Sequence, residues 1–192
     1  MKLIAINRKA GEPIKSIHSI ELYPDSAPVQ SGKPVFLPDW GGNVGFKAVL
    51  CPAYRIGRLG KSIGERFAPR YRDAVTLAAR LYPSNSPITP EIARPDIVKA
   101  WEGSVILGKW QPIGDDGRFI LAPQADPSLR LGVIPEGIDI DGMIAAVSAV
   151  MTLKMGDIII PCYLDTPMSL AIDDVIRYRL NDVDDTLIMK IK

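Results

Sequence analysis

The chain has 192 residues, of which 47% are apolar, and this length and composition predict one domain with one sizeable core. Its 23 basic and 22 acidic residues give a formal net charge of +1, without the basic surplus that non-specific nucleic-acid binding requires. The apolar run LIAI near the N-terminus is too short for a signal peptide or a membrane span. We therefore expect a cytoplasmic protein with no nucleic-acid and no membrane partner.

Short strands separated by turns are predicted for the first half of the chain, because prolines and glycines are spread along it. The expected strands cover residues 2–6, 17–24, 35–37, 46–54 and 73–82. Pro52 interrupts the fourth of these and suggests an edge strand or a bulge. The fifth has alternating apolar residues that favour a strand and alanines that favour a helix, and we expect the strand. Residues 64–71 predict one helical turn, cut by Pro69.

The clearest element of the second half is a helix over residues 137–153. Its apolar stripe consists of Ile140, Met143, Ile144, Val147 and Met151. Asp139 or Asp141 can cap its start, and Gly156 is the expected left-handed stop at its end.

The other segments of the second half are strands and turns. We expect short helical turns over 89–103, a strand within 102–113, a hairpin turn over 114–120, a buried strand over 157–163 and a terminal hairpin over 173–192. Many strands with one good helix predict an α+β fold that is mostly β.

The cysteines and the histidine predict no zinc site and no catalytic triad. Cys51 and Cys162 lie far apart in the sequence without a metal-binding spacing, which fits a reducing compartment. Cys162 falls in the expected buried strand, so we interpret it as a structural thiol. A triad would have to use His18, in a segment without a nucleophile motif. The segment GRLGKS over residues 57–62 lacks the spacing of a phosphate-binding loop.

Four segments resemble the fumarylacetoacetate hydrolase family. They are IGRLGKSIGERFAPRYRDAVTLAAR, IVKAWEGSVILGKW, IDIDGMIAAVSAVMTLKMGDIII and the closing DDVIRYRLNDVDDTLIMKIK. The third resembles the family's C-terminal signature, in which a helix is followed by TL and by a tight GD turn into a strand. The resemblance covers residues 45–192 of a single family-like domain spanning 1–192, with 1–44 as a divergent N-terminal segment.

The resemblance implies a fold, an assembly and a chemistry. The fold would be a mixed β-sandwich or β-roll with short helices and one longer helix before the C-terminal strands, usually assembled as a homodimer. Members cleave or rearrange bonds beside a carbonyl in small oxo-acids. A divalent cation, usually Mg²⁺, is held by an E-x-E pair, a further acid and an aspartate, with a lysine nearby. Residues i and i+2 of a strand point to one face, so an E-x-E pair can converge on one cation.

This sequence departs from that ligand set. The resemblance places Lys47 and Val49 where the family has its E-x-E pair, and Arg80 where it has its aspartate. Each cation close to a divalent metal would repel it by about 4 kcal/mol at intermediate dielectric. We therefore expect no metal and no cofactor to be bound in the family's manner. Lys99 matches the family's lysine, and Glu102 replaces an aspartate.

Two interpretations of these cations remain open from the sequence. Lys47, Arg80 and Lys99 can form a metal-free site for a small carboxylate-type anion, with Lys99 and Glu102 as vestigial catalytic residues. Alternatively, Lys47 and Arg80 reach solvent from a collapsed pocket, with Glu102 or Asp73 as partners.

The leading functional hypothesis is a divergent family member without metal-dependent catalysis that binds a small anion. One alternative is an active, Mg²⁺-dependent hydrolase, isomerase or decarboxylase of an acylpyruvate-like oxo-acid. The other is a structural subunit that pairs with an active paralogue. Whether the protein is an enzyme is left open by the sequence.

Overall fold

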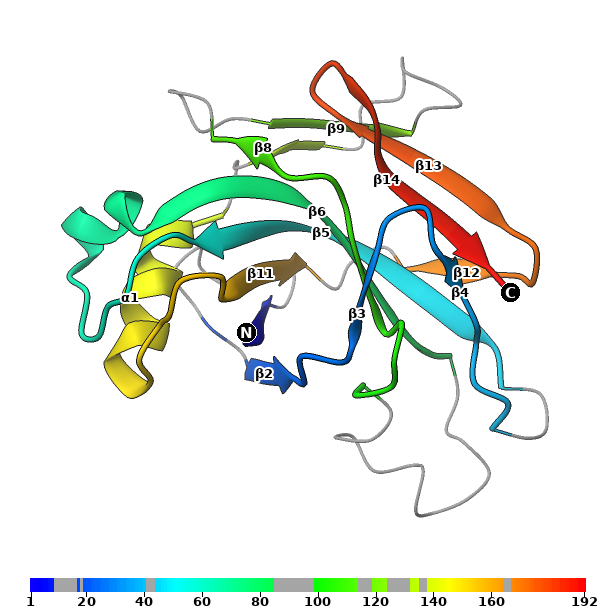
Figure 1. Cartoon of the computed structure of the whole chain (residues 1–192), viewed down its shortest axis with the longest axis horizontal. Coiled ribbons are helices and arrows are strands. Elements are labelled where there is room, and N and C mark those ends of the chain that lie inside the picture. The colour runs from blue at the N-terminus through cyan, green and yellow to red at the C-terminus, as the bar shows by residue number, and fades with distance from the viewer. Residues whose placement is uncertain are drawn as a thin grey trace.

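A computed structural model describes residues 1–8, 17, 19–40, 44–84, 99–113, 119–123, 132–134, 138–163 and 167–192. Strands dominate this part of the chain, as predicted (Figure 1). They are β1 (Leu3–Arg8), β2 (Ser19–Tyr23), β3 (Pro28–Gln30), β4 (Pro34–Val35), β5 (Phe46–Ile56), β6 (Arg72–Pro83), β7 (Val105–Leu107), β8 (Gln111–Pro112), β9 (Phe119–Pro123), β10 (Gly132–Ile134), β11 (Ile158–Tyr163), β12 (Met168–Leu170), β13 (Val175–Leu180) and β14 (Val183–Ile191). The helices are the 3₁₀ helix η1 (Glu65–Arg70) and the α-helix α1 (Ile140–Val150).

Within the described residues, the strands form a large sheet of nine and a small sheet of five. The large sheet has the order β2-β1-β11-β5-β6-β7-β3, with β12 beside β5 and β8 beside β6, and the small sheet has the order β10-β9-β13-β14-β4. The predicted α+β class with mostly β structure is therefore confirmed. The terminal hairpin is also confirmed, as β13 and β14.

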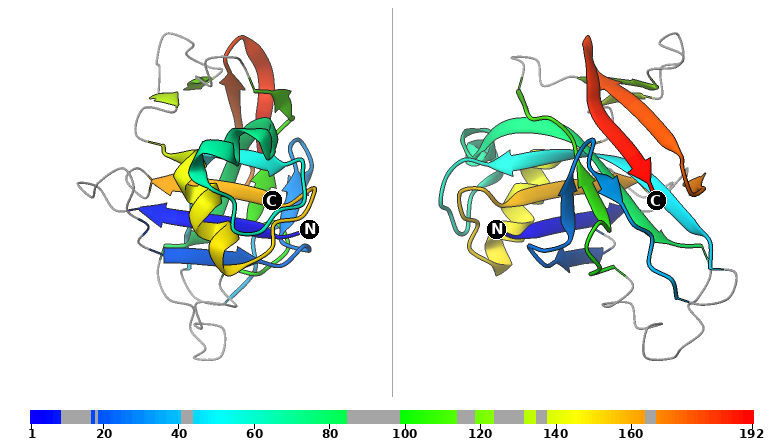
Figure 2. Two further views of the ribbon diagram at one scale, coloured as in Figure 1. Left: turned by 90° about the vertical axis from the view of Figure 1, so that its left-hand side faces the viewer. Right: turned by 45° about the vertical axis from the view of Figure 1, so that its right-hand side comes forward.

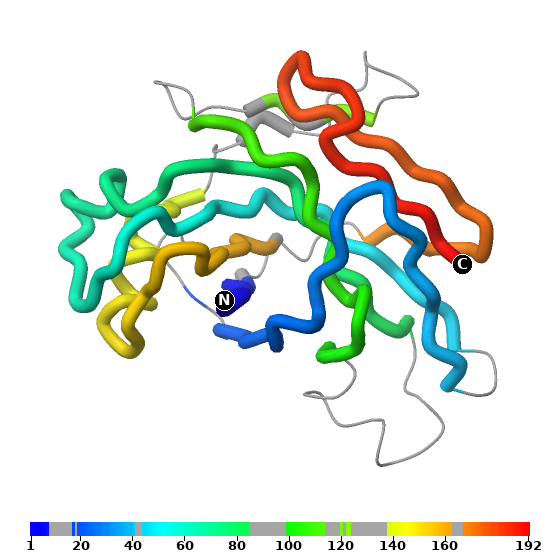
Figure 3. The backbone as a smooth tube through the Cα atoms, in the orientation of Figure 1, coloured from blue at the N-terminus to red at the C-terminus, as the bar shows by residue number. Residues whose placement is uncertain are grey.

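The centre of the large sheet is the long antiparallel pair β5 and β6, whose curved paths lie side by side in Figure 3. The expectation that Pro52 marks an edge or a bulge is wrong. Strand β5 lies inside the sheet, and its irregularity falls at Arg55/Ile56. Opposite β6, β5 pairs with β12 at its start and with β11 at Tyr54 and Arg55, so Pro52 lies between the two ladders. Its missing N–H therefore removes no ladder bond to either strand.

The two faces of the large sheet bury different sets of side chains. On one face Ala48, Tyr54 and Leu77 join a large apolar core with side chains from α1 and the small sheet. Figure 1 shows α1 at one end of the large sheet and the β13–β14 hairpin towards the other, and both views of Figure 2 agree. The opposite face carries a smaller cluster that includes Val49 and Cys51. The candidate site lies on this second face.

Helix α1 forms as its sequence predicts, but it ends differently. Asp139, not Asp141, is the N-cap, and its Oδ1 accepts from the Gly142 N–H at 2.9 Å. The helix ends at Val150 because Met151 is extended, so Gly156 is not its stop. Gly156 has a φ of +85° and turns the chain into β11 instead.

Gly108 allows the two sheets to come together closely. A Cβ at this position would lie 2.5 Å from the Thr186 carbonyl oxygen of β14, so a side chain would force the sheets apart. The neighbouring Lys109 N–H donates to the same oxygen at 2.8 Å. This contact ties the end of β7 to the small sheet.

Some predicted features lie wholly or mostly outside the described residues: the hairpin turn expected over 114–120, whose last two residues begin β9, most of the helical turns expected over 89–103, and His18. In the part that the structure describes, no helix has both the length and the apolar character needed to cross a membrane.

Candidate functional site

A cavity of about 320 Å³ opens on the second face of the large sheet. It is lined by Asn7, Glu21, Tyr23, Val49, Arg80, Tyr82 and Lys99. Strand alternation explains the set, because side chains two residues apart share a face. Glu21 and Tyr23 are such a pair on β2, and Arg80 lies directly opposite Val49 in the β5–β6 register.

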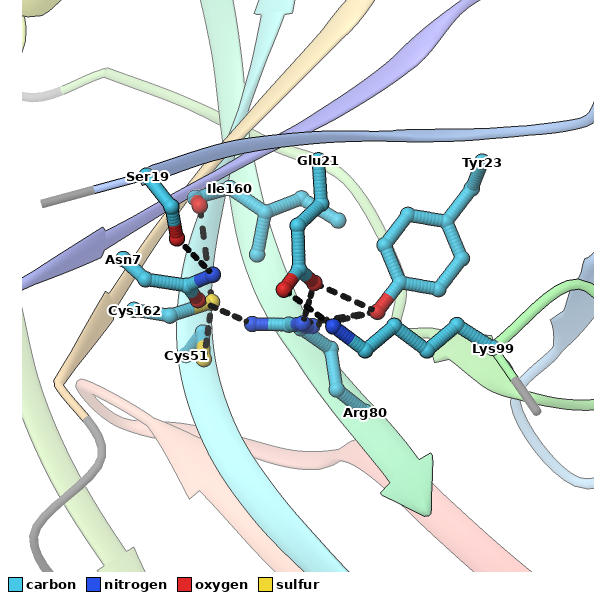
Figure 4. A network of polar contacts seen from close by, with 9 residues as sticks. All are labelled: Asn7, Ser19, Glu21, Tyr23, Cys51, Arg80, Lys99, Ile160 and Cys162. Carbon is cyan, nitrogen blue, oxygen red and sulfur yellow. Dashed lines mark hydrogen bonds and ion pairs between the residues drawn. The ribbon is translucent and has the colours of Figure 1, made fainter. Parts of the chain in front are cut away.

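Arg80 is the most deeply buried charge of the cavity, with only 7% of its surface exposed. Its Nη1 donates to Asn7 Oδ1 at 2.7 Å, and its Nη2 donates to Glu21 Oε2 at 2.5 Å (Figure 4). Nε and Nη2 both donate to the Tyr23 hydroxyl, at 3.0 and 2.7 Å. A buried guanidinium is tolerated only with such partners, because an unpaired buried charge is strongly destabilising.

Glu21 links the two cations of the cavity. Its Oε2 faces Arg80 and its Oε1 accepts from the Lys99 ammonium. Burial alone would raise the pKa of Glu21, but the Lys99 hydrogen bond and the positive charges of Arg80 and Lys99 lower it below its usual value. Glu21 is therefore a carboxylate at neutral pH.

The two tyrosines of the cavity stay neutral. Burial raises the pKa of Tyr23 above its usual value, and the same cause raises the pKa of Tyr82. The Tyr23 hydroxyl can therefore accept from Arg80 while it keeps its own proton. Tyr82 brings a second neutral hydroxyl to the cavity wall.

The structure brings together only part of the cation set proposed from sequence. Arg80 and Lys99 meet through Glu21, whereas Lys47 is half-buried and lies opposite Tyr82 without lining the cavity. Glu102 is exposed and lines a separate pocket of about 570 Å³. The interpretation that Arg80 reaches solvent is wrong, because the cavity buries its guanidinium.

The alternative partners suggested for Lys47 and Arg80 are engaged elsewhere or lie apart. Asp73 accepts from Arg55 Nε at 2.8 Å, and Glu102 is in its separate pocket. Arg80 uses Glu21 instead.

Sequence reasoning missed Asn7, Glu21 and Tyr23, all of which lie in the segment taken as divergent. A usable signal was present in SIELY, whose alternation puts Ser19, Glu21 and Tyr23 on one face. What the sequence could not reveal is that this face turns towards Arg80, because that depends on β2 pairing with β1 and on β1 pairing with β11.

The described residues do not fit a divalent cation at this cavity. Glu21 is the one carboxylate among the lining residues, and it already faces two positive side chains. Across the described residues, no group of three or more His, Cys, Asp or Glu side chains could hold a metal ion. Mg²⁺ prefers several oxygen ligands, and carboxylates are its usual protein ligands. The arrangement is instead suited to a small anion, because the lining residues carry two positive charges against one negative.

Comparison with known proteins shows the fold. No protein-family model matches the sequence, and no curated protein matches it. Solved structures do match. The 5-carboxymethyl-2-hydroxymuconate delta-isomerase from Mycobacterium smegmatis has a TM-score of 0.79 at 20% identity, over 99% of this chain and 76% of that chain.

Two further structures extend the match. Maleylpyruvate hydrolase from Sphingobium sp. SYK-6, in complex with manganese (II) ion and pyruvate, has a TM-score of 0.76 at 21% identity, over 99% of this chain and 69% of that chain. A protein from Yersinia pestis CO92, described as belonging to the fumarylacetoacetate hydrolase family, has a TM-score of 0.73 at 18% identity, over 100% of this chain and 92% of that chain. The chain therefore has a fold like that of the fumarylacetoacetate hydrolase family, as its sequence predicted.

Proposed function

We propose that this chain is a divergent member of the fumarylacetoacetate hydrolase family that binds a small carboxylate-bearing oxo-acid without a divalent cation. The observation that carries the proposal is the buried Arg80, fixed by Asn7, Glu21 and Tyr23 in the wall of a cavity that also contains Lys99. One of the fold's solved examples, a maleylpyruvate hydrolase, holds pyruvate and manganese (II). For this chain, the proposed ligand belongs to the same class as pyruvate, but it is bound without a metal ion.

Charge supports an anionic ligand of low valence. Arg80 and Lys99 together outweigh Glu21 by one positive charge, so a monocarboxylate would neutralise the lining. The low effective dielectric of a partly buried cavity strengthens that attraction relative to water. Pyruvate and similar 2-oxo monocarboxylates have the required charge and fit a cavity of about 320 Å³.

The two cations have different roles in this proposal. Arg80 is held in one position and supplies fixed positive charge. The Lys99 side chain is 36% exposed, and within the part of the chain that the structure describes its ammonium pairs with Glu21, so it can turn towards an incoming carboxylate. The neutral hydroxyl of Tyr82 offers a hydrogen bond to the carbonyl or carboxylate oxygen.

The test is calorimetric titration with pyruvate, in EDTA and again in excess Mn²⁺. We expect binding in EDTA, unchanged by Mn²⁺, and at least about tenfold weaker in Lys99→Met, since losing a charge-assisted hydrogen bond costs about 1.5 kcal/mol or more. The matched control is Lys61→Met, which removes an exposed lysine outside the cavity. Binding that requires Mn²⁺ would overturn the proposal.

The variant Lys47→Met tests whether the anion site contains three cations, as the sequence suggested, or only the two that line the cavity. If Lys47 is part of the anion site, as the sequence suggested, this variant should weaken pyruvate binding. Its position outside the cavity lining predicts a smaller loss than that of Lys99→Met.

A second candidate is an active hydrolase or isomerase of an acylpyruvate-like oxo-acid. It is favoured by the names of structures that share the fold, among them a delta-isomerase and a maleylpyruvate hydrolase. Incubating the protein with an acylpyruvate and Mn²⁺, and following loss of the enol absorbance, tests it. Turnover that Lys99→Met abolishes would favour this candidate over simple binding.

The proposal also covers the oligomeric state of the protein and its location in the cell. We propose a cytoplasmic homodimer, on the family resemblance, and sedimentation equilibrium of the purified chain tests the dimer. A monomer that becomes stable only with a longer homologue would favour the structural-subunit alternative instead.

A further inference from the structure

Two cysteine side chains meet directly behind the candidate site. Cys51 lies on β5 and Cys162 on β11, and their Sγ atoms are 2.8 Å apart (Figure 4). Both residues are free thiols with 1% of their surface exposed. Two sulfurs this close, on strands far apart in sequence, need an explanation beyond ordinary packing.

The sheet register explains why the thiols meet. Strands β5 and β11 are antiparallel, with Ile158 opposite Arg55 and Ile159 opposite Tyr54. The recorded ladder ends at Tyr54, but extending its register by three residues puts Cys162 opposite Cys51, in agreement with the short distance between their Sγ atoms. Directly opposed side chains of antiparallel strands have Cβ atoms about 4.5–5.5 Å apart, close to the separation of about 3.5–4.5 Å that a disulfide requires. A small adjustment of the strands can therefore close the bond.

The environment makes the two thiols chemically different. Burial raises the pKa of Cys51, so it keeps its proton and donates it to Cys162 Sγ. Burial alone would also raise the pKa of Cys162, but the hydrogen bond from Cys51 and the charge and hydrogen bond of Arg80 lower it below its usual value. The arrangement is a nucleophilic sulfur between a guanidinium and a proton-bearing partner.

We propose that Cys51 and Cys162 are a reversible dithiol–disulfide pair, oxidised by a small hydroperoxide. Cys162 sulfur attacks the terminal peroxide oxygen, the O–O bond breaks, and the leaving alkoxide or hydroxide takes up a proton. The resulting sulfenic acid is attacked by Cys51 sulfur, so that the S–S bond forms and the S–O bond breaks. The departing hydroxide leaves as water with the proton of Cys51. The dithiol loses two electrons and the peroxide gains them.

An oxidant that reaches these buried sulfurs has to be small. Arg80 lines the cavity, and its positive charge also lowers the pKa of Cys162, so this side chain connects the cavity with the sulfur. Hydrogen peroxide is little larger than water, so a small movement beside Arg80 is enough to admit it, whereas a bulky disulfide reagent needs a larger opening.

Oxidation would also change the charge behind the cavity, and this consequence rests on the proposed function. The hydrogen bond from Cys51 and the charge of Arg80 lower the pKa of Cys162, so negative charge on its sulfur in the reduced protein offsets Arg80, whereas a disulfide is neutral. The oxidised protein should therefore bind pyruvate several-fold more tightly than the reduced protein. Equal affinity would overturn the coupling, and absence of pyruvate binding in both states would overturn the proposed function; neither result bears on whether the disulfide forms.

The decisive experiment counts thiols on the full chain. Protein reduced with dithiothreitol and then freed of it is treated with stoichiometric hydrogen peroxide while folded. It is then denatured in iodoacetamide and weighed by mass spectrometry. The chain contains two cysteines, so the reduced sample should take up two alkyl groups. The oxidised sample should take up no alkyl group and weigh two hydrogens less than the reduced, unalkylated chain. It should remain a single chain on a non-reducing gel, and dithiothreitol should restore both thiols.

Variants identify the role of each sulfur. Cys51→Ala should leave the oxidation at a sulfenic acid on Cys162 that dimedone traps, whereas Cys162→Ala should keep an alkylatable Cys51 after peroxide. Two alkylatable thiols in peroxide-treated wild type, or chains linked to each other, would overturn the proposal. Since the wild-type measurement involves no substitution, it decides the question even where a variant folds poorly.

Discussion

The two faces of the large sheet use the same strands for opposite purposes. Towards α1 and the small sheet, β5 and β6 present Tyr54, Leu77 and other apolar side chains to the large apolar core. Towards the cavity, the same strands present Cys51 and Arg80, which contact polar groups of β1, β2 and β11. Successive residues of a strand point to opposite faces of the sheet, so a register shift of one residue would exchange side chains of the apolar core with side chains of the cavity face.

The comparison teaches where each face obtains its stability. The apolar face depends on burial and close packing, which respond to lost volume. The polar face depends on pairing, because a buried guanidinium without its partners is destabilising. Substitutions on the two faces should therefore differ in how they can be rescued and in what they do to a ligand.

The largest expected effect is on the apolar face. Leu77 is fully buried, so Leu77→Ala leaves a cavity and should lower the free energy of unfolding by about 4 kcal/mol. Urea denaturation measures it. The folded fraction should bind pyruvate with unchanged affinity, because Leu77 points away from the site. A loss below about 1 kcal/mol would contradict the packing argument.

A slightly smaller effect is expected on the polar face. Glu21→Ala leaves Arg80 buried without its carboxylate and should lower the free energy of unfolding by about 3 kcal/mol. Adding Arg80→Met to the same chain should restore much of that loss, since an apolar side chain of similar length needs no partner. No comparable second substitution should rescue Leu77→Ala. Equal losses in the single and double variants would show that Glu21 acts by something other than pairing.

The apolar face could be predicted from sequence more completely than the polar one. Helix α1 follows from a local periodic pattern, which left Asp139 and Asp141 as its two candidate caps, and the strand character of β6 follows from alternation. The wrong expectation for Pro52 has a physical reason: whether a strand is an edge depends on β11 and β12, which lie far along the chain. Propensity carries no information about such neighbours.

The polar face was predicted only in part. Arg80 and Lys99 were identified through the family resemblance, but their partner Glu21 was not. The contact between Cys51 and Cys162 depends on β11 entering the sheet beside β5, which no local pattern specifies. Residues that meet through non-local strand pairing are the ones that single-sequence reasoning misses.

Two tyrosine-to-phenylalanine substitutions, one on each side of the large sheet, compare the faces through smaller expected changes in the free energy of unfolding. Tyr23→Phe removes the hydroxyl that accepts from Arg80 Nε and Nη2, and should lower the free energy of unfolding by about 1.5 kcal/mol. The matched control is Tyr178→Phe in the large apolar core, whose hydroxyl makes a long 3.8 Å contact to Met168 Sδ among the described residues. That change should have an effect of less than about 0.5 kcal/mol. Equal effects of the two substitutions would remove the distinction.

Acid should weaken the polar face before the apolar one. The pKa of Glu21 is lowered in the folded chain, so its contribution to stability is present above the unfolded pKa, about 4.3, and is lost as pH falls through the lower folded value. Asp157, whose pKa is lowered by Lys2 and by the Lys154 N–H despite its burial, adds to the same trend. Urea titrations at about pH 6 and about pH 3.5 should show stability falling with acid. The fall should be shallower in Glu21→Gln and unchanged in Leu77→Ala.

The smallest change in stability should accompany one of the largest changes in binding. The Lys99 side chain is 36% exposed, so Lys99→Met removes a partly screened ion pair and should change the free energy of unfolding by about 0.5 kcal/mol or less. Arg80 still compensates Glu21 in that variant, which is why the fold should tolerate the change. Pyruvate titration of the same sample should nevertheless show the tenfold loss expected for a group that turns to the ligand. A destabilisation comparable to that of Glu21→Ala would show that Lys99 is needed to hold the polar network together. Lys99 could then not be the cation that turns towards the ligand.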